Sequence, residues 1–225
     1  MGQAVGDILP MAVGVAISPV PIIAIILILM TPKARSNGIA FVTGWILGLS
    51  VVGFAALAFF NASGVSTSSG ASQGAAAAKL VFGLLFLVLA AKQWRSRPKS
   101  GDDAVMPKWM STIDAFTPGK SLALAALLSG VNPKNLLLTV SAAATVAEVA
   151  DLGGTQQTAA MVVFILLASL TVLAPLVVYL TMGAKATAVL GQWKVWLSQN
   201  NATIMFVLFV VFAAVMIGQG VSGLG

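Results

Sequence analysis

The sequence predicts an all-α membrane protein of six transmembrane helices, arranged as two inverted three-helix repeats with a broken first helix in each repeat. Three observations lead to this fold class. The 225 residues are 59% hydrophobic and only 8% charged, and their mean hydropathy is +1.01, values typical of integral membrane proteins. The apolar residues fall into six stretches, each near or above the roughly 20 residues that a crossing helix needs. Two of these stretches contain a helix-start signal halfway along.

Basic residues mark one side of the expected topology. The six expected spans are 8–30, 38–60, 76–93, 120–147, 157–182 and 201–221. The loops at the ends of the first, third and fifth spans hold ten of the twelve Lys and Arg residues, whereas the other loops and both termini hold none. Loops rich in Lys and Arg stay in the cytoplasm. We therefore expect a multi-pass protein with both termini outside.

The long central loop divides the chain into two expected domains. Residues 1–93 form the first three-helix repeat, 94–119 a basic cytoplasmic loop, and 120–225 the second three-helix repeat. Because each repeat has an odd number of spans, the two repeats cross in opposite directions, as in many transporters. Trp109 and Ile113 have helical spacing, which predicts a short interfacial helix near the end of the loop.

Gly44 and Gly48 lie four residues apart in the second expected span. Small residues at this spacing allow the backbones of two membrane helices to approach closely. We expect this pair to serve packing inside the molecule rather than a contact between two copies.

The first and fourth expected spans each contain Ser or Asn followed by Pro. Ser18-Pro19-Val20-Pro21 interrupts the first span, and Asn132-Pro133-Lys134-Asn135 interrupts the fourth. A capping residue followed by Pro is how helices usually begin. A bilayer tolerates such a break only where protein or a water-filled cavity surrounds it. Two breaks, one in each half of the chain, point to a transporter site.

Both breaks are expected near the membrane midplane, where their amide ends favour negative charge. About 18 Å of helix separates Asp7 from Pro19, and about 20 Å separates Lys120 from Pro133, against a hydrocarbon thickness of about 30 Å. Lys134 adds a positive charge there, and the expected spans contain no Asp or Glu to neutralise it. We expect an anionic head group to bind at this place. The candidate substrate-binding residues are Ser18, Pro19, Pro21, Asn132, Pro133, Lys134 and Asn135. The alternative for each break is a purely structural kink.

Several classes of function are disfavoured by composition. The chain contains neither Cys nor His, so thiol chemistry and imidazole metal sites are absent. Without these residues or paired acids there is no catalytic constellation, and we expect neither an enzyme, nor a metal, nor a cofactor. The net charge of +6 lies in short loops between apolar spans, which indicates topology rather than nucleic-acid binding.

The two breaks and the basic loop after the first of them resemble the LysE superfamily of small bacterial exporters. Within it, the central basic loop and Ser-Gly-Val-Asn-Pro-Lys-Asn, residues 129–135, resemble the GAP-like (sulfolipid-addressing, Sap) branch. The resemblance implies a six-span exporter in the bacterial cytoplasmic (inner) membrane that delivers glycolipids or related amphiphiles to the cell surface. It also implies that the residues of the two breaks form the site. Unlike metal-exporting relatives, this chain carries no intramembrane acidic motif, and Val20 stands where many relatives have Gly.

The function we expect is outward transport of an anionic or amphipathic, lipid-like substrate by alternating access around the broken helices. Two alternatives remain: an amino-acid or small-cation exporter of the LysE type, and an accessory subunit of a lipid-export complex. The expected partners are the lipid bilayer, the substrate, and either a second copy of the chain or a larger lipid-export machinery.

Overall fold

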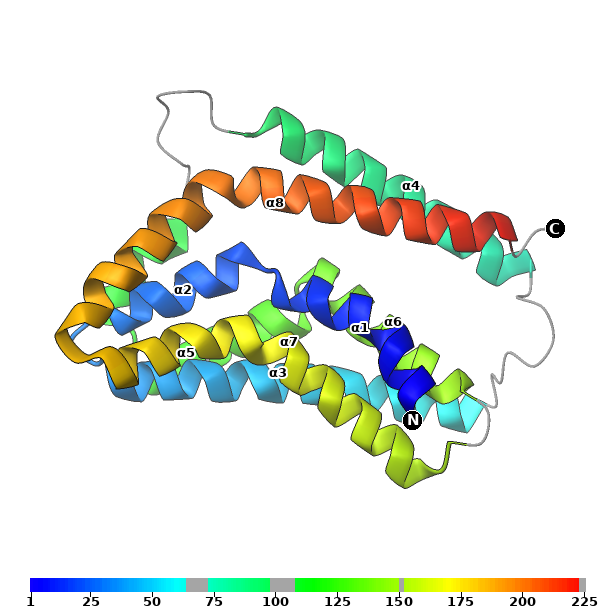
Figure 1. Cartoon of the computed structure of the whole chain (residues 1–225), viewed down its shortest axis with the longest axis horizontal. Helices are drawn as coiled ribbons and strands as arrows, with labels where there is room; N and C mark the ends of the chain where they lie inside the picture. Colours follow the sequence, from blue (N-terminus) through cyan, green and yellow to red (C-terminus); the bar gives the residue numbers. More distant parts are fainter. Residues whose placement is uncertain (64–72, 98–107, 150–151, 223–225) are drawn as a thin grey trace. The chain divides into compact units, whose positions relative to one another are not determined.

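The computed structural model describes residues 1–63, 73–97, 108–149 and 152–222, and these are helical with short turns and no strand. The α-helices are α1 (Gly2–Ala16), α2 (Pro19–Leu29), α3 (Ala34–Ser63), α4 (Gln73–Arg95), α5 (Pro118–Gly130), α6 (Pro133–Glu148), α7 (Gly154–Met182) and α8 (Ala186–Ser222). Two 3₁₀ helices, η1 (Lys108–Ala115) and η2 (Gly183–Lys185), lie before α5 and after α7 (Figure 1). Each expected span coincides with part of one helix or one bent helix pair, and only Met30, at the end of the first span, lies just beyond its helix.

Both expected breaks are present. The axis bends by 52° between α1 and α2 and by 63° between α5 and α6. Pro19 and Pro133 occupy the first helical turn after each bend, where the missing N–H of proline costs no hydrogen bond. The broken first helix of each expected repeat is therefore a feature of the fold.

Among the described residues, two helical stretches are long and apolar enough to cross a membrane. They are Ala34–Ala62 and the continuous run Gly154–Ser222, and the number rises to four if each bent pair counts as one crossing. The described part of the chain is thus an all-helical membrane protein with two to four candidate spans.

The chain forms two compact units. Unit 1 comprises Met1–Ser66 and Met106–Val195, and unit 2 comprises Thr67–Val105 and Trp196–Gly225. This division does not follow the two expected repeats: unit 1 holds the first two expected spans of both repeats, and unit 2 holds the third expected span of each.

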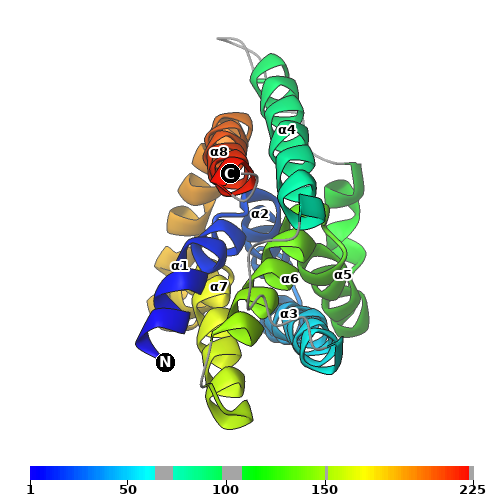
Figure 2. The same cartoon turned by 90° about the vertical axis from the view of Figure 1, so that its right-hand side faces the viewer.

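Within unit 1, helix directions follow from a few close contacts. Gly44 and Gly48 of α3 face Leu122 and Ala126 of α5, so these two helices run parallel. Gly38 and Gly53 of α3 face Leu176 and Met161 of α7, so that pair runs antiparallel. Figure 2 shows α5 beside α3 and α1 beside α7. These directions match the alternation expected for the first two spans of each repeat.

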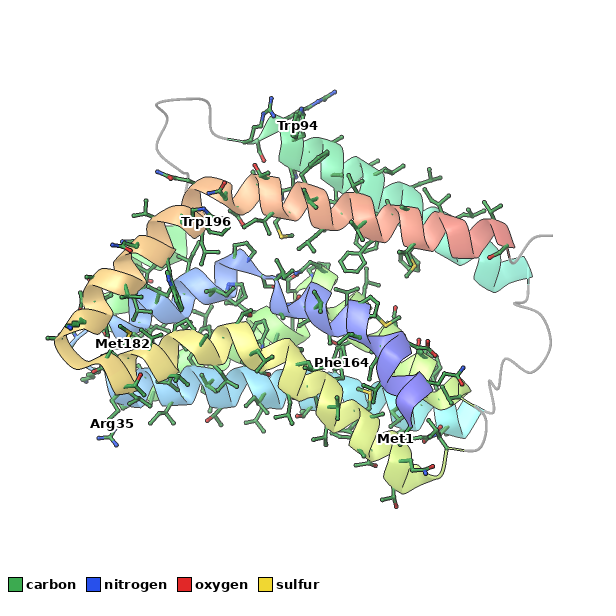
Figure 3. All side chains as sticks on the ribbon, in the orientation of Figure 1. Met1, Arg35, Trp94, Phe164, Met182 and Trp196 are labelled. Atoms are coloured by element: carbon green, nitrogen blue, oxygen red, sulfur yellow. The ribbon has the colours of Figure 1, made fainter. Side chains whose placement is uncertain are left out.

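Gly44 and Gly48 explain the tight α3–α5 packing. A Cβ at Gly44 would overlap the backbone of Leu122, and one at Gly48 would overlap Ser129 Oγ and the carbonyl of Ala126. The expected internal packing role of the glycine pair is confirmed. Around it, unit 1 has a core of fully buried large side chains, including Phe164 of α7 (Figure 3).

Unit 2 is held by aromatic contacts between α4 and the second part of α8. The ring of Phe86 lies 5.8 Å from that of Phe209, and Trp94 lies 4.7 Å from Phe206. The Arg97 guanidinium sits 3.6 Å from the centre of the Trp94 ring, a cation–π arrangement. The aromatic residues fix the two helices antiparallel.

Candidate functional site

The first break leaves the carbonyl groups of the last turn of α1 without helical partners. Helix α1 ends because Ser18 has an extended conformation (φ −127°, ψ 92°) and Pro19 follows it. The Ser18 N–H donates to Ala16 O at 2.8 Å, and its hydroxyl donates to Val15 O at 2.8 Å. Two further carbonyls, of Gly14 and Ile17, need donors from elsewhere.

Lys134 supplies these donors from the first turn of α6. Its Nζ donates to Gly14 O at 2.7 Å, to Ile17 O at 3.0 Å and to Ser18 Oγ at 2.7 Å. An ammonium group has three donors, so all three are used. Lys134 is only 5% exposed, and a buried charge is tolerated only when it is paired in this way.

These contacts correct one electrostatic expectation. Lys134 does not lie as an unneutralised charge beside the amide ends. Its ammonium group lies at the carbonyl end of α1, where the helix dipole is negative and stabilises a cation. The neutralising groups are backbone oxygens, so no carboxylate is needed.

Thr171 of α7 completes the set of donors at the first break. Its hydroxyl donates to Ala16 O. Every carbonyl from Val13 to Ile17 thereby has a partner, because the Ile17 N–H donates to Val13 O at 2.9 Å. The donors to these carbonyls thus include Ser18 at the start of α2, Lys134 of α6 and Thr171 of α7.

The second break has a different set of partners. The Asn132 side chain caps α6 by accepting from the Lys134 N–H at 3.1 Å. Asn135, which is fully buried, donates to Leu128 O in the last turn of α5 at 3.0 Å. Its Oδ1 accepts from Ser18 Oγ at 3.3 Å. Asn135 therefore joins the two breaks to each other.

The amide ends of α2 and α6 offer fewer donors than a typical helix start. Pro19 and Pro21 have no N–H, so Val20 alone carries one among the first three residues of α2. In α6, Pro133 has no N–H and that of Lys134 is bound by Asn132. Each end therefore contributes about one backbone N–H, compared with about four at an ordinary helix N-terminus.

The structure brings together Ser18, Lys134 and Asn135 by direct hydrogen bonds, with Asn132 one turn away. Pro19, Pro21 and Pro133 act through the backbone, by ending helices and removing donors. Sequence reasoning missed the carbonyls of Gly14 and Ile17 and the role of Thr171. One signal was available: a proline break orphans the carbonyls of the preceding turn, and those groups required donors.

Within the described ranges, no group of three or more His, Cys, Asp or Glu lies close enough to hold a metal ion. The site consists of one ammonium group, hydroxyls, carboxamides and backbone groups. Such groups can bind polar ligands by hydrogen bonds and charge.

Comparison with known proteins adds a family to this geometry. Residues 8–222 match the family model described as Sap, sulfolipid-1-addressing protein. No curated protein matches the chain, and no solved structure matches it. The match extends over both helix breaks and includes Ser18, Lys134 and Asn135. The chain belongs to the Sap, sulfolipid-1-addressing protein family.

Proposed function

We propose that the protein is a secondary-type exporter that moves an anionic or amphipathic, glycolipid-like substrate outward through a site at the two helix breaks. The single observation that carries this proposal is the bonding of one break to the other. Lys134 and Asn135, from the bent pair α5–α6, hold the carbonyl end and the capping Ser18 of the bent pair α1–α2. Discontinuous helices that meet in this way are typical of transporter sites.

The packing of unit 1 supports an inverted-repeat mechanism. The first bent pair packs its α1 against α7, and the second packs its α5 against α3, so each bent pair contacts the unbroken helix of the other expected repeat. Rocking of one repeat against the other would then move the two breaks relative to each other. Six crossings, with both termini outside the bacterial cytoplasmic membrane, and a place in the LysE superfamily belong to this proposal.

Lys134 makes the proposed site positively charged, and it links substrate binding to helix movement. All three donors of the ammonium group are bound to α1 and Ser18, so a sulfate, phosphate or carboxylate head group must displace at least one of these oxygens. Binding of the anion would thereby release the end of α1 from α6. In this mechanism substrate recognition and helix movement are the same event.

The direct test is transport by the purified chain in phosphatidylcholine vesicles. A fluorescent sulfated glycolipid is followed by chemical quenching of the label in the outer leaflet. The chain should accelerate movement of the label between leaflets. Lys134→Met should slow it about tenfold, since a hydrogen bond to a charged group contributes about 1.5–3 kcal/mol.

Two controls accompany this test. Lys134→Arg, which keeps the charge, should retain more activity than Lys134→Met, and Lys185→Met, which removes an exposed lysine, should leave the rate unchanged. An unaltered rate and affinity in Lys134→Met would overturn the proposed site.

One observation favours a second candidate, an amino-acid or small-cation exporter. The oxygens of Gly14, Ile17 and Ser18 surround an ammonium group, and the same oxygens would suit a substrate amine if Lys134 moved away. Counterflow of labelled lysine in vesicles separates the two candidates. Lysine exchange without glycolipid movement would support the cation exporter.

An accessory role in a larger lipid-export complex makes a different prediction. The purified chain would then be inactive alone and would regain activity only with its partner. Movement of the sulfated glycolipid by the chain alone, as a monomer or a homodimer, would exclude a purely accessory role.

A further inference from the structure

An apolar groove runs along the α3–α5 pair of unit 1. Its volume is about 500 Å³, within the range of about 300–1,000 Å³ typical of small-molecule pockets. Each residue that lines it is apolar or glycine. The groove is separate from the polar network at Lys134, and nothing in the proposed headgroup site accounts for it.

The shape of the groove suits a thin, flexible ligand. Gly48, Ala126 and Gly130 are among its small lining residues, while Leu127 and Val131 also line it and are 56% and 63% exposed. At Gly44 and Gly48 the backbone of α3 lies directly against α5, with no room for a side chain between the two helices. A slot between such helices admits an alkyl chain more readily than a helix about 10–12 Å wide.

A basic residue precedes the groove-lining residues of α5 by about one helical turn. Lys120, in the first turn of α5, is exposed. Leu127 and Val131 follow it at seven and eleven residues, so they lie on the same face of the helix. From Ala123 to Val131 the apolar part extends over about 12 Å, and it ends at the second break. Along α5 the order is a positive charge, an apolar slot and the bend.

We propose that this groove binds one alkyl chain of an anionic membrane lipid, with the acidic head group of that lipid at Lys120. The charge at one end and the apolar slot behind it complement the two parts of such a lipid. The groove is also lined by residues of α3. This helix contains the candidate span Ala34–Ala62. The inference rests on the proposed function, to which it adds a sideways route from the bilayer toward the second break.

Photolabelling of the whole chain in phosphatidylcholine vesicles tests this site. The probe is a phosphatidylglycerol with a diazirine within its acyl chain, and labelled peptides are identified by mass spectrometry. Label should concentrate in 47–52 and 123–131. Ala123→Leu, which places a larger side chain in the slot, should lower this labelling about fivefold, equivalent to about 1 kcal/mol of binding free energy.

Matched variants separate a specific site from general contact with lipid. Ala58→Leu makes the same change at an exposed alanine of α3 that does not line the groove, and it should leave the labelling unchanged. Lys120→Gln should lower labelling by the phosphatidylglycerol probe about fivefold, equivalent to about 1 kcal/mol per basic residue near an anionic lipid. A phosphatidylcholine probe should not respond to Lys120→Gln.

Three outcomes would overturn the inference: uniform labelling of all lipid-facing helices, insensitivity to Ala123→Leu, or absence of label from 47–52 and 123–131. If transport still depended on Lys134 in any of these cases, the proposed function would stand without the groove. Specific labelling of the groove without transport would instead retain the lipid site and reject the exporter.

Discussion

The two helix breaks begin with the same chemistry, a capping residue followed by proline, yet their surroundings differ. At the first break, Lys134, Ser18 and Thr171 supply donors to the carbonyls of α1 that have no helical partner. At the second break, Asn135 bonds to Leu128 O, and the C-cap residue Val131 is 63% exposed beside an apolar groove. The first break is closed by polar contacts, and the second lies next to an apolar groove.

This difference suggests that the two breaks have different roles in substrate binding and transport. A break with every carbonyl bonded is held in one geometry, because each bond would have to be lost for the helix end to move. A break beside an open, apolar surface has fewer such restraints. The first break therefore suits recognition of charge, and the second suits passage of an apolar chain.

The largest expected effect comes from removing the ammonium group at the first break. Lys134→Met leaves the carbonyls of Gly14 and Ile17 without donors, and we expect the free energy of unfolding to fall by about 3 kcal/mol. Thermal unfolding in detergent micelles measures this loss. A Lys134→Met protein as stable as the wild type would show that the first break is not held by Lys134.

A substitution at the packing contact next to the second break should lower the free energy of unfolding somewhat less than Lys134→Met does. Gly48→Val inserts a side chain against Ala126 and Ser129, and we expect a loss of about 2 kcal/mol from overpacking. Gly6→Val provides a control, because a Cβ at Gly6 meets nothing within 4 Å. Equal melting temperatures of the two variants would contradict the close α3–α5 contact.

Loss of the cap of α6 should have a smaller effect. Asn132→Ala removes the acceptor of the Lys134 N–H and should lower the free energy of unfolding by about 1 kcal/mol. Asn132→Asp, which keeps an acceptor oxygen, should restore most of this loss in the same unfolding assay. If neither substitution changed the free energy of unfolding, Pro133 alone would fix the start of α6.

The smallest expected effect is at Thr171. Thr171→Val keeps the shape of the side chain and removes its bond to Ala16 O, for a loss of about 0.6 kcal/mol, the average for hydrogen bonds between membrane helices. Ala16 O retains the Ser18 N–H as a donor. A double-mutant comparison with Lys134→Met would reveal whether the two donors act together, and strict additivity would argue against a shared network.

The helix breaks could be predicted from the sequence because proline acts locally. Pro19 and Pro133 have no N–H and favour the first helical turn, whatever surrounds them. The glycine pair Gly44 and Gly48 was equally readable, since close approach of two backbones depends on the absence of a side chain. Local covalent chemistry determines both features.

The partners of Lys134 could not be predicted in the same way. They are backbone oxygens of Gly14 and Ile17, more than 100 residues away, and every residue type carries such an oxygen. The sequence revealed a buried charge without a carboxylate, but it did not reveal which helix end would neutralise it. The grouping of α4 with the second part of α8 likewise depends on contacts between distant aromatic residues.

The hydroxyl of Ser18 has two acceptors within reach and a single hydrogen to give. Val15 O lies at 2.8 Å and Asn135 Oδ1 at 3.3 Å, so the hydroxyl serves them alternately. A turn about one C–O bond is enough to exchange a bond inside α1 for one that reaches α6. The hydrogen bond between Ser18 and Asn135 can therefore form or break by rotation of a single hydrogen, while every heavy atom stays in place and Lys134 remains bonded to Gly14 O and Ile17 O.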